Sequence, residues 1–378
     1  MQITGIVCEY NPLHSGHKKQ IDYLKGLGHM VVCLMSGNFV QRGSPAIFDK
    51  MTRAKAALSC GADLVLELPV QYALSSAEGF ATGAVHILSM LCNNICFGAE
   101  TADVDALMDM AKLLRSDDFS RQLRVQLDKG LSFPAARQAA VSAMGGNADL
   151  LQTPNNILAV EYCKAILAQN SQLTPLVLHR QGSYHACVPE KENPSATALR
   201  NLMTEGCDWR PFVPRELISL YEDARLHTLQ QGEAAILYRL RTMHDDQFEA
   251  LPYGSEGLWR KLMHASRSCA SLEDVIDATK SKRYTRSRID RMILCAFLGL
   301  EQAILSEPAP YCRVLGFTDT GRQVLHHVKD SRYFINIGQH TGSNYESLEH
   351  RCGSLYGLFA CSPENPAAES ELRIHYHK

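Results

Sequence analysis

The sequence predicts an α/β fold with a parallel sheet over residues 1–205, followed by a mainly helical region with a few short strands over residues 206–378. Two observations lead to this prediction. Up to about residue 205, short apolar runs without helical periodicity alternate with amphipathic segments of helical length, which is typical of βαβ units. Beyond that point helical patterns dominate to about residue 305, and short strand-like pieces follow between 311 and 337. The length alone favours at least two domains.

The elements follow from local patterns. Strands are predicted where short apolar runs meet turn residues, at 3–8, 30–35, 64–68, 95–97 and 176–178. Helices are predicted from His17, from Asp49 to Cys60, from Ser75 to Leu91, after Thr153 and from Ser195, with further helices between 101 and 150. We expect a polar loop at 36–45 and a loose polar tail after Pro363.

Composition narrows the class of protein. Apolar residues make up 46% and charged residues 21%, an ordinary globular balance, and the formal net charge of −2 excludes a protein that is positively charged all over. The thirteen cysteines lack zinc-like spacing, so we expect no protein-bound metal and a reducing compartment. No apolar run approaches the ~20 residues that span a bilayer. We therefore expect a cytoplasmic protein without a membrane partner.

The first candidate site is the turn His14-Ser15-Gly16-His17, between the first predicted strand and helix. Ligands of open α/β sheets bind beyond the carboxyl ends of the strands, and a helix N-terminus attracts phosphate through its N–H groups and dipole. Gly16 has no side chain, so a phosphate or a base can approach the backbone. Histidines three apart can both donate hydrogen bonds to phosphate oxygens. The turn therefore predicts chemistry at an α-phosphate.

The sequence around this turn resembles a known family. Residues 5–17 (GIVCEYNPLHSGH) are similar to the opening of the HIGH-type nucleotidyltransferase superfamily. Further matches follow in order at 35–43 (MSGNFVQRG), 61–69 (GADLVLELP), 97–100 (FGAE) and 154–159 (PNNILA). As a set they resemble the bacterial tRNA(Met) cytidine acetate ligase family.

The resemblance implies a Rossmann-like catalytic domain and a two-step reaction. ATP and free acetate would give acetyl-adenylate and pyrophosphate. The acetyl group would then pass to N4 of the wobble cytidine of elongator tRNA(Met), giving N4-acetylcytidine, without acetyl-CoA. Mg²⁺ is expected with the ATP, bound mainly by phosphates. The residues alone identify no base for the cytidine amine.

The resemblance also implies site residues, with His14 and His17 as the catalytic pair. The implied ATP-binding residues are Val7, Cys8, Glu9, Tyr10, Asn11, Pro12, Leu13, His14, Ser15, Gly16, His17, Lys18, Lys19, Gln20, Gly98, Asn155, Asn156, Arg180, Ser195 and Thr197. At least one of Asn155 and Asn156 is expected to contact ATP, and Ser195 is either a helix cap or a phosphate ligand. Arg42 would touch acetate or phosphate, and Arg200 would supply a further positive charge.

A basic segment at 280–291 carries six positive charges and one negative charge. We interpret it as one charged helix face, which is either simply solvated or binds the tRNA backbone. The expected tRNA contacts are Lys282, Arg283, Arg286 and Arg288, with Tyr284 stacking on an exposed base.

Two other functions remain open at this point. A nucleotidyltransferase that adenylylates a small metabolite would explain the histidine turn but not the basic segment. A non-catalytic RNA-binding protein with a degenerate nucleotide site would explain the basic segment but not the intact turn.

Overall fold

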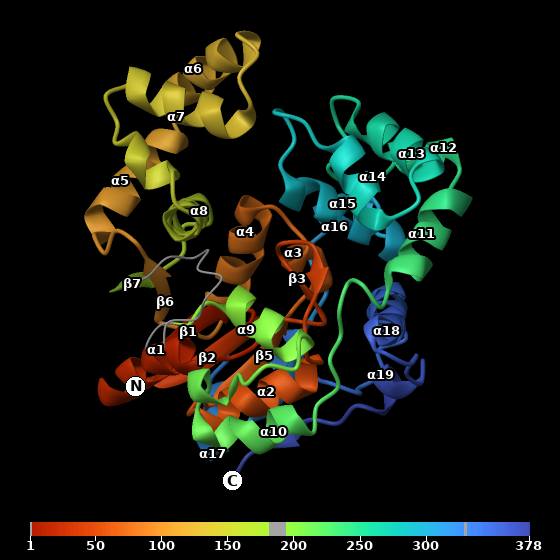
Figure 1. Cartoon of the computed structure of the whole chain (residues 1–378). Coiled ribbons are helices and arrows are strands. Elements are labelled where there is room, and N and C mark those ends of the chain that lie inside the picture. The colour runs from red at the N-terminus through yellow and green to blue at the C-terminus, as the bar shows by residue number, and fades with distance from the viewer. Residues whose placement is uncertain (1, 181–193, 329–330) are drawn as a thin grey trace.

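The computed structural model describes residues 2–180, 194–328 and 331–378, and its centre is an eight-stranded sheet (Figure 1). The strand order is β10-β8-β5-β2-β1-β6-β7, with β9 beside β8. Five neighbouring strands are parallel to one another: β1 (Ile3–Cys8), β2 (Met30–Ser36), β5 (Leu64–Leu68), β6 (Asn94–Ala99) and β7 (Thr174–His179). The predicted α/β fold with a parallel sheet is confirmed.

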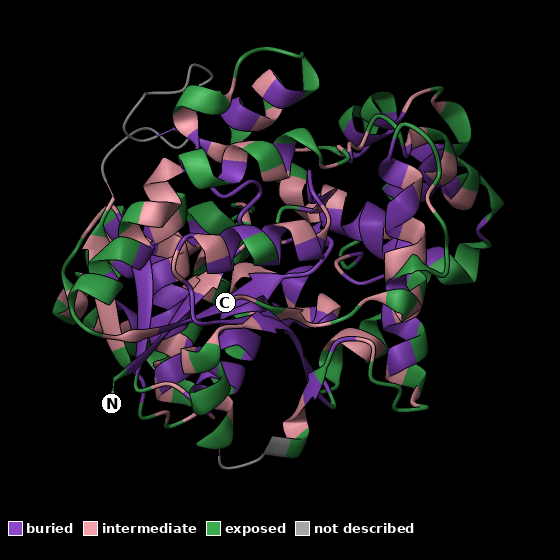
Figure 2. Cartoon of the chain, turned by 90° about the horizontal axis from the view of Figure 1, so that it is seen from below, coloured by how far each residue is buried: buried purple, intermediate pink, exposed green. Residues whose placement is uncertain are grey.

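Helices cover both faces of the sheet. Successive residues of a strand point to opposite faces, so each strand contributes side chains to two cores. Val32 and Leu34 belong to the core that contains α4 (Ala77–Leu88) and α8 (Pro154–Ala168). Val31 and Cys33 belong to the opposite core, with α1 (Ser15–Gly26) and α2 (Lys50–Ser59). Figure 2 shows the buried residues concentrated in the strands and on the helix faces toward them.

Local capping explains where these helices begin. The Asp49 carboxylate accepts hydrogen bonds from the Met51 and Thr52 amides at the start of α2. The Ser76 hydroxyl accepts a hydrogen bond from the Gly79 amide at the start of α4. The helix predicted from Ser75 to Leu91 therefore begins after Ser76, and a separate short helix, α3 (Val70–Ala73), precedes it. Pro154 occupies the first turn of α8, where its missing N–H removes no helical hydrogen bond. Between β6 and α8 lie α5 (Val104–Leu114), α6 (Asp117–Asp128) and α7 (Phe133–Ala143).

Three strands from the end of the chain complete the sheet. Strand β8 (Cys312–Phe317) pairs antiparallel with β5, and β9 (Phe334–Asn336) and β10 (His375–Tyr376) pair parallel with β8. The sheet thus contains segments from both sides of residue 205. The expectation of a loose tail is wrong for residues 368–376, which contain α19 (Ala368–Glu371) as well as β10.

A third hydrophobic core lies among helices of the C-terminal region. It contains residues of α11 (Glu233–Thr242), α13 (Leu258–Ser268), α14 (Leu272–Thr279) and α15 (Arg286–Leu298). In Figure 1 these helices and α5–α7 rise on the same side of the sheet. The helix predicted across the basic segment begins only at Arg286, because Thr285 has extended backbone angles and residues 281–284 form a turn.

A buried cluster of charged side chains joins the two ends of the chain, and we call it the ionic cluster. It consists of Lys50, Glu67, Arg313, Glu349 and Glu369. Lys50 bonds to Glu67 at 3.1 Å and also to Glu369, and Arg313 lies 2.9 Å from Glu67, 3.2 Å from Glu349 and 2.9 Å from Glu369. None of the five side chains is more than 8% exposed. The cluster ties α2 and β5 to β8, α18 (Asn344–Tyr356) and α19.

Candidate active site

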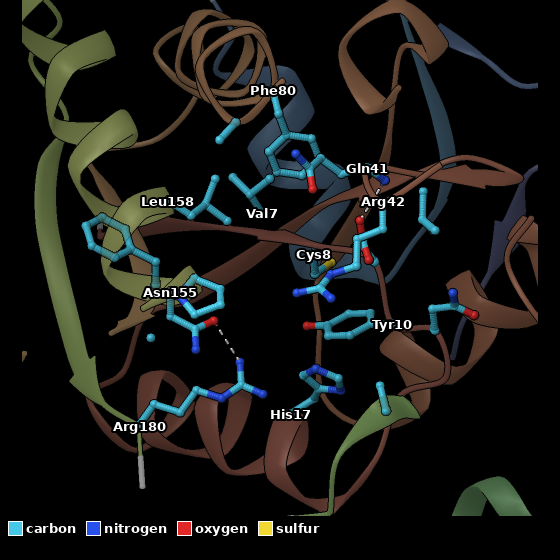
Figure 3. Close-up of a pocket in the computed structure, with 18 of the residues that line it drawn as sticks. Val7, Cys8, Tyr10, His17, Gln41, Arg42, Phe80, Asn155, Leu158 and Arg180 are labelled. Atoms are coloured by element: carbon cyan, nitrogen blue, oxygen red, sulfur yellow. Dashed lines mark hydrogen bonds between the residues drawn. The ribbon is translucent and has the colours of Figure 1, made fainter. Parts of the chain in front are cut away.

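A cavity of about 290 Å³ opens at the carboxyl ends of β1 and β6 (Figure 3). The lining comes from β1, α1, the 36–45 segment, α4, β6, α8 and α9 (Ala196–Thr204). The predicted residues that line it are Val7, Cys8, Glu9, Tyr10, Asn11, His17, Gln20, Arg42, Gly98, Asn155, Arg180, Ser195, Thr197 and Arg200. The cavity therefore brings together residues that are up to 193 positions apart (7 to 200).

His14 lies behind the pocket wall. Its Nδ1 accepts a hydrogen bond from the Gly16 amide at 3.1 Å, which caps α1, and the side chain is buried. A Cβ atom on Gly16 would lie 3.0 Å from His14 Cε1. The missing side chain at position 16 thus makes room for the His14 ring, a role that the sequence analysis did not identify.

His17 faces the pocket and stacks on His14, with 3.8 Å between the ring centroids. Burial, followed by the positive charge of Arg180, lowers the pKa of His14 to about 3. Burial, His14 and Arg180 likewise lower the pKa of His17 well below its usual value, so both rings are neutral near pH 7. The His14 amide donates to His17 Nδ1 at 3.4 Å, which places the proton of the neutral ring on Nε2. His17 can therefore donate one hydrogen bond to a ligand.

On the opposite wall Asn155 and Arg180 lie together, as Figure 3 shows. Arg180 Nη1 donates to Asn155 Oδ1 at 3.3 Å, and Asn155 Nδ2 donates to Glu100 Oε1 at 2.7 Å. Burial raises the pKa of Glu100, but hydrogen bonds from Asn155 and Thr153 outweigh it and lower the pKa overall. Asn156 is buried away from the cavity, where its Oδ1 accepts from the Thr101 amide at 2.9 Å. Of the two asparagines, only Asn155 lines the pocket.

The start of α9 contributes polar groups to the same cavity. The Ser195 hydroxyl accepts from the Ala198 amide at 3.0 Å, so the serine caps the helix and also lines the pocket. Arg200 donates to the Asn11 carbonyl at 2.7 Å and to the Thr197 hydroxyl at 3.0 Å. These bonds fix the start of α9 against the chain that follows β1.

The 36–45 segment is a small hairpin, not the polar loop that we expected. Strands β3 (Phe39–Val40) and β4 (Ser44–Pro45) pair, and most of the segment is buried. At its tip the Gln41 amide donates to Glu9 Oε1 at 2.9 Å, and Arg42 lines the cavity beside Tyr10 and Cys8 (Figure 3). Gly43 has a φ of +83°, and a Cβ atom there would lie 2.4 Å from the Arg291 amide nitrogen. The hairpin thus packs closely on α15.

A fully buried arginine supports this hairpin. Arg53 donates to the Glu9 carbonyl at 2.8 Å, to the Ser36 carbonyl at 2.9 Å and to the Phe48 carbonyl at 2.9 Å. Arg53 lies within the helix predicted from Asp49 to Cys60 and was not predicted to have a role in the site. No local signal marks it, because a helical arginine usually faces solvent.

Other residues lie differently from the sequence expectation. Ser15 donates to the Phe212 carbonyl at 3.0 Å, Lys18 pairs with Asp22 at 2.7 Å, and Leu13 is buried. Pro12, Leu13, His14, Ser15, Gly16, Lys18, Lys19 and Asn156 are absent from the described lining. An apolar wall that was not predicted from the sequence is formed by Phe80, Leu158 and Tyr162. Their helical spacing is that of ordinary core residues, so no sequence signal distinguishes them.

The basic segment combines a turn with the start of α15. Lys282 and Arg283 are exposed, Arg286 bonds to Glu273 at 2.6 Å, and Arg288 donates to the Tyr253 carbonyl at 2.9 Å. The prediction that Tyr284 stacks on a base is wrong, because its ring is buried and its hydroxyl donates to the Glu256 carbonyl at 2.7 Å.

Metal-ligand clusters and membrane-spanning helices are both absent from the described part of the chain. No group of three or more His, Cys, Asp or Glu residues there is arranged to hold a metal ion. None of the helices in that part is both long and apolar enough to cross a membrane.

Comparison with known proteins identifies relatives along the whole chain. The HIGH Nucleotidyl Transferase family matches residues 1–370. The tRNA(Met) cytidine acetate ligase of Clostridium novyi is 39% identical over 351 residues, which are 87% of this chain and 88% of that protein. The protein of the same name from Caldanaerobacter subterraneus is 39% identical over 348 residues, which are 87% and 86% of the two chains.

Solved structures agree with these relatives. Thermotoga maritima TmcAL without ligand matches with a TM-score of 0.91 at 29% identity, over 100% of this chain and 99% of that one. The same protein bound with α-thio ATP matches with a TM-score of 0.85 over the same shares. From its sequence, its fold and the histidine turn beside its cavity, this chain belongs to the HIGH nucleotidyl transferase family and, within it, to the tRNA(Met) cytidine acetate ligases.

Proposed function

We propose that this chain activates acetate with ATP and transfers the acetyl group to N4 of the wobble cytidine of elongator tRNA(Met). The observation that carries the proposal is His17, which presents a neutral Nε2–H donor in the pocket at the end of β1. The relatives named tRNA(Met) cytidine acetate ligase and the relative bound with α-thio ATP support it. Because the substrate is tRNA, we place the protein in the cytoplasm.

In this proposal ATP lies across the carboxyl ends of β1, β6 and β7. Asn155 and Arg180 hold the nucleoside half, and Gly98 leaves space for it, since a Cβ there would meet no atom closer than 3.8 Å. Ser195, Thr197 and Arg200 lie at the start of a helix, which suits the outer phosphates. Glu9 is the single carboxylate among the described lining residues. Phosphates and water would therefore supply most ligands of an accompanying Mg²⁺.

The first step is attack of an acetate oxygen on the α-phosphorus, with departure of pyrophosphate. His17 donates to an oxygen on that phosphorus, and His14 holds the His17 ring through stacking and the backbone hydrogen bond. Arg42 lies on the same side of the cavity as Tyr10 and attracts the acetate carboxylate. Positioning and charge stabilisation suffice for this step, because acetate is already the nucleophile.

The second step is attack of the cytidine amine on the acetyl carbon, with departure of AMP. Phe80, Leu158 and Tyr162 form the apolar wall that limits water around the intermediate. We assign tRNA binding to residues 206–378 and ATP chemistry mainly to residues 1–205, with no role for acetyl-CoA.

The decisive experiment incubates the protein with labelled acetate, ATP and tRNA, and then analyses the nucleosides. We expect label in N4-acetylcytidine from elongator tRNA(Met), none when ATP is omitted, and no product when acetyl-CoA replaces acetate and ATP. Pyrophosphate exchange that depends on a phosphorylated metabolite and not on acetate would contradict the proposal. Tight tRNA binding without ATP turnover would contradict it as well.

A further inference from the structure

The second step of the proposed reaction needs a proton acceptor, and the geometry points to Glu9 as the base that takes the proton from the cytidine amine. This inference rests on the proposed function and adds to it a residue whose role differs between the two steps. Glu9 follows β1 directly, lines the cavity and is half-buried.

The two steps make different demands on protons. In the first, an acetate oxygen bonds to the α-phosphorus, the bond to the pyrophosphate oxygen breaks, and no proton moves. In the second, N4 bonds to the acetyl carbon and the bond from that carbon to the AMP oxygen breaks. N4 must lose one proton in this step, because its lone pair is delocalised into the pyrimidine ring and the product is a neutral amide. A base is therefore needed in the second step alone.

Glu9 is held in place at both its side chain and its backbone. The Gln41 amide donates to Glu9 Oε1 at 2.9 Å, which orients the carboxylate. The buried guanidinium of Arg53 donates to the Glu9 carbonyl at 2.8 Å. A carboxylate fixed by one oxygen keeps acceptor capacity on the other, which is what a positioned base requires.

The chain neighbour of Glu9 lies beside the proposed phosphate donor, His17. The following residue, Tyr10, has its ring centroid 5.2 Å from the ring centroid of His17. The acetyl carbon of the intermediate is bonded through one oxygen to the phosphorus that His17 contacts. A base for the amine that attacks this carbon must line the same cavity, and Glu9 lines it together with Tyr10 and His17.

The other titratable groups of the described lining are poor acceptors. His17 accepts the His14 amide on Nδ1 and carries its proton on Nε2. Burial, followed by Cys33 and Cys8, raises the pKa of Tyr10 well above its usual value, so the phenol stays protonated. The three arginines Arg42, Arg180 and Arg200 offer N–H donors and no acceptor. Burial likewise raises the pKa of Cys8 and of Tyr162 well above their usual values, so both stay protonated and Glu9 is the group that remains.

The inference predicts that Glu9→Gln separates the two half-reactions. Single-turnover acetyl transfer at saturating tRNA should fall about 10²–10⁴-fold, the usual contribution of a general base. Acetate-dependent ATP–pyrophosphate exchange reports the first step, and its rate should fall far less than the transfer rate. Hydroxylamine, a stronger nucleophile than N4, should still trap the acetyl-adenylate that the variant forms as acetohydroxamate. Glu9→Asp should restore part of the transfer rate.

Glu78→Gln is the matched control. Glu78 lies on α4, which also supplies Ala77 and Phe80 to the pocket, but its side chain is 69% exposed and pairs with Lys164. Both half-reactions should keep their wild-type rates in this variant.

Two results would overturn the inference. Equal loss of exchange and transfer in Glu9→Gln would assign the residue to ATP or Mg²⁺ binding. Unchanged transfer would show that the departing AMP phosphate takes the proton itself. Failure of the proposed function is distinguishable from both, because the wild-type protein would then show no acetate-dependent exchange.

Discussion

Two groups of polar and charged side chains lie at the same edge of one sheet, and they are built differently. In the ionic cluster, Glu67 of β5 and Arg313 of β8 are neighbours in strand register, and the five side chains are buried against one another. In the active-site pocket, His17 and Asn155 border a cavity of about 290 Å³. Charges that neutralise one another hold elements together, whereas donors that face a cavity bind ligands. The first group should therefore control stability and the second should control activity.

The largest expected effect is on stability, from Arg313→Ala. This change leaves Glu67, Glu349 and Glu369 buried together with Lys50 as their remaining cation. Removal of one partner from a buried ion pair typically costs about 3–5 kcal/mol. Denaturant unfolding should show this loss of free energy. The control Arg121→Ala removes a pair in which both side chains are more than two-thirds exposed, and should change stability by less than about 1 kcal/mol.

His17→Ala should instead lower activity strongly and change stability little. Loss of one transition-state donor typically lowers the rate about 10²–10³-fold, and acetate-dependent pyrophosphate exchange measures it. Because His17 faces a cavity, the His17→Ala variant should lose far less free energy of unfolding than the Arg313→Ala variant. An exchange rate equal to that of the wild-type protein would remove His17 from the mechanism and break the comparison.

The ionic cluster should also depend on pH, because it contains three carboxylates and two cations. Burial raises the pKa of Glu349 to about 7, against the opposing effect of Arg313. The folded state then binds this proton more tightly than the unfolded state. The stabilisation that protonated Glu349 contributes is complete below the ordinary glutamate pKa of about 4.3. It is lost as the pH rises to 7. Burial would raise the pKa of Glu369 as well, but Lys50 and Arg313 lower it overall, so its contribution is lost only in stronger acid.

Glu349→Gln tests this titration. Between pH 5 and pH 8 the wild-type protein should lose on the order of 2 kcal/mol of unfolding free energy relative to the variant. Denaturant unfolding at several pH values measures the difference. Parallel pH profiles for the two proteins would show that Glu349 does not titrate in this range.

The same contrast explains how much the sequence could predict. The five parallel strands and the histidine turn follow from apolar runs and local spacing, which are short-range signals. The ionic cluster unites residues from 50 to 369, and no pattern shows that β8 adds to β5. The short hairpin at 36–45 and the buried Arg53 depend on long-range packing in the same way. Local periodicity also assigned residues 280–285 to a helix, although tertiary contacts bury Tyr284 in a turn.

The smallest effect on the protein itself is expected in the basic segment, where two charges are exposed to water and belong neither to the ionic cluster nor to the pocket. Lys282 and Arg283 are exposed in the turn before α15, whereas Arg286 bonds to Glu273. Charges exposed to water contribute little to folding, so the double variant Lys282→Ala/Arg283→Ala should keep its unfolding free energy within about 1 kcal/mol. If both side chains contact phosphates, tRNA affinity should fall several-fold and the slope of log affinity against log salt should decrease by about 1–2. Filter binding at several salt concentrations measures both quantities.

Acetate-dependent exchange should be unchanged in this double variant, because the pocket lies in another part of the molecule. A loss of exchange comparable to the loss of tRNA affinity would instead connect this turn to the pocket, through the packing of the 36–45 hairpin on α15.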